Sequence, residues 1–146
     1  MDEIDKNILN ILEKDSRKSA SAIGEIVNLS VPAVLERMKK LDKANIITEY
    51  TIKINRKKLG FSLAAFILVV LERSADIKGF RDKITQIPNV LECHHVAGQY
   101  DYILKICVKD TDDLEHFLMD VLKNIDGVAS SNTLISLSIL KENFNV

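Results

Sequence analysis

The chain has 146 residues, with 20 Lys and Arg, 21 Asp and Glu and a formal net charge of −1. This length allows one compact domain or two small ones and excludes a large barrel enzyme. An apolar fraction of 47%, with only two prolines and five glycines, excludes disorder of the whole chain. No uncharged apolar stretch is long enough for a membrane span, and two cysteines do not make a secreted disulfide scaffold. The N-terminus lacks a signal-peptide core, so we expect a soluble, cytoplasmic protein.

The charge is divided unevenly along the chain. Residues 1–58 carry 12 Lys and Arg against 9 Asp and Glu, a balance of +3, whereas residues 59–146 carry 8 against 12, a balance of −4. Such asymmetry indicates two parts with different roles. The polar segment 55–61 is the candidate linker, which predicts domains at 1–54 and 62–146.

Residues 1–54 predict three short helices followed by a strand or short hairpin. The first helix begins near Asp2, and the second runs from Ser19 to Asn28, a residue that tolerates the left-handed turn conformation. Ser30 is the expected N-cap of a third helix that ends near 44. Alternating apolar residues predict the strand over 46–54. The expected buried residues of the second and third helices are Ala22, Ile23, Ile26, Val27, Val34, Met38 and Leu41.

Residues 62–146 predict the element order β-α-β-β-α-β. Strands are expected near 63–72, 90–96, 102–108 and 132–140, with helices after Asp76 and after Asp110. This order is the ferredoxin-like pattern, an antiparallel four-stranded sheet with both helices on one face.

The face of that sheet without helices is expected to be apolar. The first strand carries apolar residues on both faces, and Ile103 and Cys107 lie opposite the helix side of the third strand. A monomer would leave these groups in water, so the face needs a cover. A second copy related by closed symmetry is the simplest cover, and partial cover by the N-terminal half is the alternative.

The second and third helices, joined by a short turn, predict a helix-turn-helix that places the later helix in a DNA major groove. Residues at the start of that helix would approach base edges, and basic residues would neutralise phosphates. With few polar side chains at the tip, apolar contacts and DNA shape should share the readout. The alternative is a three-helix bundle with a solvated charged face. The candidate DNA-binding residues are Arg17, Lys18, Ser30, Val31, Pro32, Ala33, Glu36, Arg37, Lys39 and Lys40.

The segment 98–102, Gly-Gln-Tyr-Asp-Tyr, has two interpretations. It is a plain β-hairpin, or a small-molecule site in which the Asp101 carboxylate could pair with an α-ammonium group. A metal site is disfavoured, because adjacent strand residues His94 and His95 point to opposite faces and two ligands make no site. We therefore interpret these side chains as ordinary strand and helix residues and not as metal ligands: Cys93, His94, His95, Cys107 and His116. No catalytic motif or cofactor fingerprint is present, so we expect no enzyme and no cofactor.

The ordered segments together resemble the leucine-responsive/AsnC family of transcription regulators over nearly the whole chain. The matching segments are Ile4–Leu9, Arg17, Leu29-Ser30, Arg37, Leu41, Ile46-Ile47, Tyr50, Gly98–Tyr102, Gly127-Val128, Thr133, Leu137 and Lys141. The resemblance implies an α+β protein, with a winged helix-turn-helix followed by a ferredoxin-like effector domain, assembled as dimers or octamers. It also implies an amino-acid effector that binds near the hairpin. The residues implied to contact it are Gly98, Gln99, Tyr100, Asp101, Ser131 and Thr133.

Several positions depart from the family pattern. Asn28 and Asn45 stand where the family often has Gly, Glu49 replaces a frequent Gly, and Ser131 replaces a common Thr.

From the helix-turn-helix and the family resemblance together, we predict a sequence-preferring regulator that binds double-stranded DNA, oligomerises and responds to an amino acid. The alternative is a DNA-wrapping architectural protein of the same fold without an effector.

Overall fold

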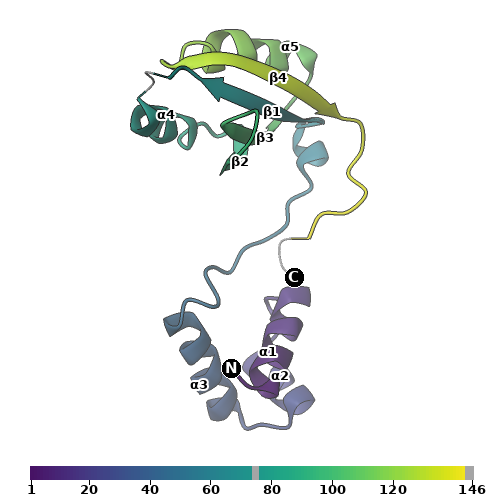
Figure 1. The fold of residues 1–146 in the computed structure, drawn as a ribbon. Coiled ribbons are helices and arrows are strands. Elements are labelled where there is room, and N and C mark those ends of the chain that lie inside the picture. The colour runs from purple at the N-terminus through teal and green to yellow at the C-terminus, as the bar shows by residue number, and fades with distance from the viewer. Residues whose placement is uncertain (74–75, 144–146) are drawn as a thin grey trace. The chain divides into compact units, whose positions relative to one another are not determined.

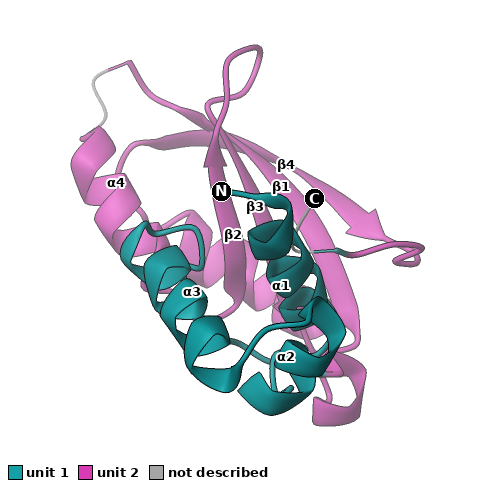
Figure 2. Ribbon diagram, turned by 90° about the horizontal axis from the view of Figure 1, so that it is seen from below, with its two compact units in different colours: residues 1–54, 143–146 teal, residues 55–142 magenta. Residues whose placement is uncertain are grey.

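The computed structural model describes residues 1–73 and 76–143. Internal contacts divide the chain into two compact units, shown in different colours in Figure 2. One is Met1–Ile54, which Asn143 joins, and the other is Asn55–Glu142. The expected linker at 55–61 contains the short 3₁₀ helix η1 (Arg56–Leu59) and groups with the second unit.

The first unit contains the three predicted helices, α1 (Glu3–Lys14), α2 (Ala20–Val27) and α3 (Val31–Lys43). Ser19 and Ser30 are N-caps as expected, because their hydroxyl oxygens accept the N–H groups of Ala22 and Ala33. The core of this unit is made of Ile8, Leu12, Ile23, Val34 and Leu41.

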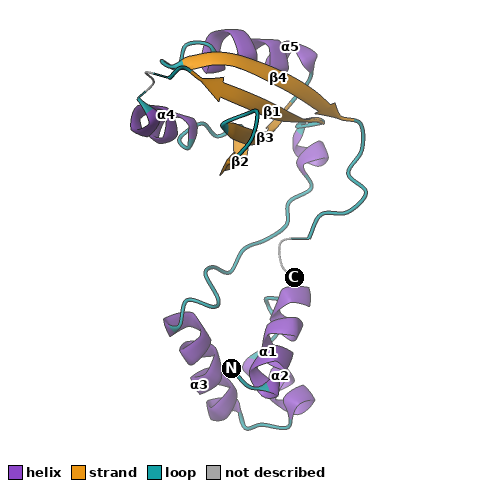
Figure 3. Cartoon of the chain, in the orientation of Figure 1, coloured by secondary structure: helices purple, strands orange, loops and turns teal. Residues whose placement is uncertain are grey.

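Two predictions for this unit are wrong. Ile26 is 58% exposed, because α2 is only two turns long and its neighbours cover the side that carries Ile23. The segment 46–54 forms no strand in the described structure and is drawn as loop in Figure 3. A strand needs partners for its backbone N–H and C=O groups, and no described strand lies beside this one. The expected wing is therefore absent from the described part of the chain.

The second unit confirms the ferredoxin-like order (Figure 1). Its strands are β1 (Leu63–Leu71), β2 (Val90–His95), β3 (Tyr102–Val108) and β4 (Val128–Ser136), all antiparallel in the order β2-β3-β1-β4. The helices α4 (Ile77–Ile84) and α5 (Thr111–His116) cover one face, and α5 continues as the π-helical segment η2 (Phe117–Leu122). The strand expected at 132–140 was misplaced: β4 starts directly after the turn at Gly127, and Leu137 and Leu140 are 96% and 95% exposed beyond its end.

Strand register assigns every side chain to one of the two faces. Ala65, Ile67 and Val69 are fully buried on the face that carries the helices. The alternate residues of β1, Phe66, Leu68 and Val70, lie on the other face, which we call the open face. Cross-strand partners share a face, so Leu134, opposite Phe66, also lies on the open face and is 53% exposed.

Candidate DNA-binding and ligand-binding sites

A tight turn sets the start of α3 against α2. Asn28 closes α2 with φ 55° and ψ 50°, the left-handed conformation that its position predicted. The Leu29 N–H donates to the Gly24 carbonyl at 2.9 Å, and a Cβ at Gly24 would lie 2.5 Å from the Leu29 oxygen. Only glycine therefore fits at this position of α2, a requirement that the sequence analysis did not identify.

The start of α3 is open to solvent at Ser30, Val31 and Pro32, while Ala33 is half-buried. The Ser30 hydroxyl is already used as the helix cap, at 3.4 Å from the Ala33 nitrogen. Val31, 40% exposed, and Pro32 thus present an apolar tip. Such a tip suits contacts with thymine methyl groups and DNA shape.

Further along α3, the exposed basic residues are Lys39, Lys40 and Lys43. The Lys40 ammonium lies 2.8 Å from the Glu36 carboxylate, and both side chains are strongly exposed. The hydrogen bond from Lys40 lowers the pKa of Glu36, so Glu36 stays ionised at neutral pH. Glu36 therefore partly neutralises the charge that Lys40 would offer to a phosphate.

Arg37 has a different environment from the one predicted. Its guanidinium lies 2.7 Å from Asp2 Oδ2 and 2.7 Å from Asp5 Oδ1 at the start of α1. A mutual backbone capping box and Arg37 together lower the pKa of Asp2 and of Asp5. Arg37 thus connects α3 to α1, and its charge is paired with two carboxylates of the same unit.

Arg17 and Lys18 lie in the turn between α1 and α2. Asp15 organises this turn: its carboxylate accepts the Arg17 N–H at 3.1 Å, and its carbonyl accepts the Lys18 N–H at 3.1 Å. The Arg17 side chain is exposed, whereas Lys18 is half-buried and lines a groove with Ile26 between α1 and α2. Arg17 is the better placed of the two to contact a phosphate.

The hairpin between β2 and β3 has the conformation that its glycine suggested. Gly98 has φ 149°, outside the range that other residues favour. The Asp101 carboxylate accepts the Leu71 N–H at 2.8 Å, and the Asp101 N–H donates to the Val69 carbonyl at 2.9 Å. One carboxylate oxygen of Asp101 therefore holds the loop on β1.

The structure brings only part of the predicted effector set together. The Tyr100 hydroxyl lies 3.4 Å from the amide nitrogen of Asn132 on β4, while Gly98 and Gln99 are exposed. Asn132 is paired with Leu68 and lies on the open face. Ser131 and Thr133, paired with Val69 and Ile67, point to the helix face, apart from that pair. The β4 residue that lies beside Tyr100 is Asn132, which the sequence analysis did not name.

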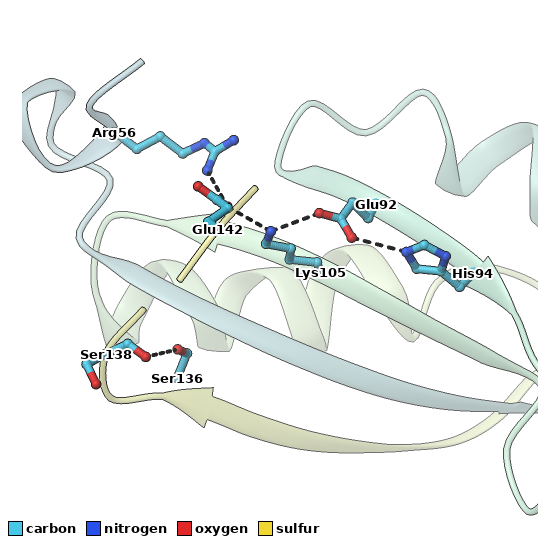
Figure 4. Close-up of polar contacts among 7 residues, drawn as sticks. All are labelled: Arg56, Glu92, His94, Lys105, Ser136, Ser138 and Glu142. Atoms are coloured by element: carbon cyan, nitrogen blue, oxygen red, sulfur yellow. Dashed lines mark hydrogen bonds and ion pairs between the residues drawn. The ribbon is translucent and has the colours of Figure 1, made fainter. Parts of the chain in front are cut away.

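A chain of charged and polar contacts crosses the open face from Arg56 to His94 (Figure 4). Lys105 on β3, whose side chain is 16% exposed, lies 2.8 Å from Glu92 and 2.9 Å from Glu142. Arg56 extends the chain to Glu142 at 3.6 Å, and a hydrogen-bond contact at 3.1 Å joins His94 Nε2 to the Glu92 carboxylate. Hydrogen bonding to Lys105 lowers the pKa of Glu92, and hydrogen bonding to Glu92 raises the pKa of Lys105.

The described residues 1–73 and 76–143 contain no group of three His, Cys, Asp or Glu side chains that could hold a metal ion. Cys107 is buried, and burial raises the pKa of the half-buried Cys93 thiol. Within the same ranges, no helix is long and apolar enough to span a bilayer.

Comparison with known proteins gives one consistent result. Residues 1–42 match the AsnC-type helix-turn-helix domain, and residues 64–146 match the Lrp/AsnC ligand binding domain. The chain is 32% identical to the HTH-type transcriptional regulator FL11 of Pyrococcus furiosus over 97% of this chain and 93% of that protein. It is 36% identical to the HTH-type transcriptional regulator LrpC of Bacillus subtilis over 81% of each.

Similarity to solved structures agrees with these sequence matches. A transcriptional regulator of Neisseria meningitidis in complex with L-methionine has a TM-score of 0.96 and 28% identity, over all of this chain and 96% of that one. AsnC of Escherichia coli has a TM-score of 0.92 and 26% identity, over 98% of this chain and 96% of that one. Both likenesses extend across both units.

Proposed function

This chain belongs to the Lrp/AsnC family of DNA-binding transcription regulators, which are not enzymes, and from that premise we propose how it works. It binds duplex DNA in the cytoplasm through α3, forms a homodimer through the open face of the sheet, and responds to an amino acid. The observation that carries the proposal is the exposed tip of α3, held by the Gly24–Asn28 turn and followed by lysines.

DNA binding through α3 divides into two kinds of contact. Val31 and Pro32 at its start approach base edges, and Lys39, Lys40 and Arg17 neutralise phosphates. Two copies of α3 in a dimer read half-sites on one face of the duplex. Arg37 contributes by holding α3 in place on α1.

A gel-shift titration with DNA from the protein's own upstream region tests this interface. Replacing Lys39 and Lys40 by Gln should weaken binding strongly, because each lost phosphate contact removes a counterion-release contribution. The matched control replaces Lys78 and Lys83 on α4, which changes the net charge equally. Glu36→Gln should strengthen binding, since it removes a carboxylate beside the phosphates. Equal binding by the Lys39/Lys40 variant and the control would contradict the proposed role of α3.

The homodimer rests on the open face of the sheet. Phe66 is 39% exposed and Leu134 53% exposed on neighbouring strands, so an isolated unit leaves apolar surface in water. Lys105 on this face is already paired with Glu92 and Glu142 within the chain, so covering it leaves no unpaired charge there. A second copy of the same face closes the assembly by two-fold symmetry.

Light scattering measures the oligomeric state directly. Phe66→Asp combined with Leu134→Asp should halve the solution mass at concentrations where the wild type is dimeric. Ile77→Asp on α4 is the control, because Ile77 is similarly exposed at 52% and an acidic residue suits a helix start. An unchanged mass for the double variant would place the interface elsewhere; larger assemblies such as an octamer would appear in the same measurement.

The amino-acid response is supported by the ligand-binding domain and by the methionine complex of the Neisseria neighbour. In this chain the Tyr100–Asn132 pair next to Gly98 is the proposed contact region. A bound ligand would favour one assembly state and so change DNA affinity. Calorimetry with a panel of amino acids should give binding that Tyr100→Ala weakens. Silence across the panel would instead favour the architectural protein without an effector.

A further inference from the structure

Three side chains meet on the helix face of the sheet, at the base of the β2–β3 hairpin. Arg81 comes from α4, His95 ends β2, and Tyr102 begins β3. The Arg81 Nε donates to the Tyr102 hydroxyl at 2.7 Å, and an Arg81 terminal nitrogen lies 3.4 Å from His95 Nδ1. The rings of His95 and Tyr102 stack with centroids 5.0 Å apart, and the guanidinium carbon lies 5.7 Å from the Tyr102 centroid. We call these three residues the Arg81 cluster.

The hydrogen bonds inside the Arg81 cluster occupy acceptor atoms of His95 and Tyr102, whereas several of its N–H and O–H donors have no described partner. A guanidinium can only donate, so His95 Nδ1 is the acceptor in this contact. The Tyr102 oxygen accepts from Arg81 and keeps its own hydrogen to donate. Within residues 1–73 and 76–143 we find no acceptor for that hydrogen, although Tyr102 is only 2% exposed. Two of the five guanidinium N–H groups are used, so the cluster presents mainly donors.

The positive charge of Arg81 also lacks an anionic partner in the described structure. No described carboxylate lies within ion-pair distance of its guanidinium. Asp82, the next residue on α4, lies 3.4 Å from Lys78 instead. The neighbouring Cys93 thiol supplies no thiolate at neutral pH, because burial raises its pKa. The guanidinium is nonetheless fixed by its hydrogen bonds and by the Tyr102 ring, which reduces the entropy cost of binding a ligand.

We propose that the Arg81 cluster is a receptor for a carboxylate group. A planar guanidinium matches the two oxygens of a carboxylate, and hydrogen bonds between charged groups are the strong ones in proteins. The cluster lies on the helix face, whereas Tyr100 and Asn132 lie on the open face, so it is a second site. The carboxylate comes from a free small molecule or from an acidic side chain of another copy of this chain.

Nuclear magnetic resonance of the ¹⁵N-labelled full-length protein tests the receptor. Acetate should shift the Arg81 Nε–H signal and the His95 and Tyr102 amides along a saturable curve. Arg81→Gln should abolish the amide shifts, and Arg81→Lys, which keeps the charge without the fork, should weaken binding roughly tenfold. Lys78→Gln on the same helix should bind acetate as the wild type does. A thermal melt confirms that each variant is folded.

Acetate titration and light scattering together distinguish the two sources of the carboxylate. Saturable acetate shifts assign a free small molecule. No acetate shift, together with a lower light-scattering mass for Arg81→Gln than for Lys78→Gln, assigns an acidic side chain of another copy. If neither arm responds, or if inorganic phosphate shifts the signals and acetate does not, the carboxylate receptor is wrong. These readouts do not involve DNA or Tyr100, so they separate this inference from the proposed function.

Discussion

Replacing Gly24 by Ala tests the turn that positions α3. The new Cβ would lie 2.5 Å from the Leu29 carbonyl oxygen, a backbone atom that cannot rotate away, and 3.6 Å from a Val34 methyl. Overpacking costs about 1–3 kcal/mol, and a contact this short with a backbone atom belongs in the upper part of that range, about 2–3 kcal/mol. The gain in helix propensity from Gly to Ala offsets about 1 kcal/mol of that cost. We therefore expect a net loss of roughly 1–2 kcal/mol in the free energy of unfolding of the first unit.

Gly79→Ala in α4 is the matched control. There the added Cβ would meet only the side chain of Asp76, which makes no capping hydrogen bond and can swing away. This substitution should stabilise the second unit by about 0.5–1 kcal/mol. Urea titrations followed by circular dichroism compare the two variants, and a gel shift reports whether Gly24→Ala also weakens DNA binding. A Gly24→Ala protein as stable as the wild type would refute the close approach of α2 and the turn.

Three further predictions concern stability. Asn28→Ala should destabilise the first unit by up to about 1–2 kcal/mol in urea, because Ala tolerates the left-handed conformation less well than Asn, and Asn28→Gly should cost much less, since Gly has no Cβ. Acid should weaken the same unit, because the pKa values of Asp2 and Asp5 are lowered in the folded state. The stabilisation that these two carboxylates provide is fully present above the ordinary pKa of aspartate and is lost as the pH falls through their lowered pKa values. Thermal melts of the Asp2→Asn, Asp5→Asn protein should therefore show a stability that depends less on acid pH. Ile67→Ala, at a fully buried position, should cost about 2–5 kcal/mol in the second unit, and a calorimetric loss below 1 kcal/mol would contradict the assigned core.

Features that depend on nearby residues could be predicted from the sequence. Asn28 was expected to be left-handed because the residue type and the adjoining helices define the turn locally. The order of strands and helices in the second unit followed from apolar periodicity, and it is confirmed. The caps at Ser19 and Ser30 needed only three residues of context each.

Features that depend on distant partners could not be predicted. The Arg37 ion pair with Asp2 joins residues 35 positions apart, and no local sequence pattern identifies a partner at that separation. The segment 46–54 has strand-like alternation, but alternation does not supply a hydrogen-bonding partner. Exposed apolar residues at Leu137 and Leu140 extended the predicted last strand beyond its observed end.

Which residues of β4 lie beside the hairpin depends on strand register, which the sequence pattern does not fix. Because strand side chains alternate, a shift of one residue moves a contact to the other face of the sheet. The structure therefore places Asn132 beside Tyr100 and turns Ser131 and Thr133 to the helix face.

The salt dependence of DNA binding tests the central claim most directly, namely that the lysines of α3 contact DNA phosphates. Each phosphate contact contributes about 0.9 to the slope of log K against log salt. Fluorescence anisotropy of a labelled duplex should give a steep negative slope for the wild type. The slope should be shallower by about 2 per protomer for the Lys39→Gln, Lys40→Gln protein. An identical slope for the two proteins would contradict the account.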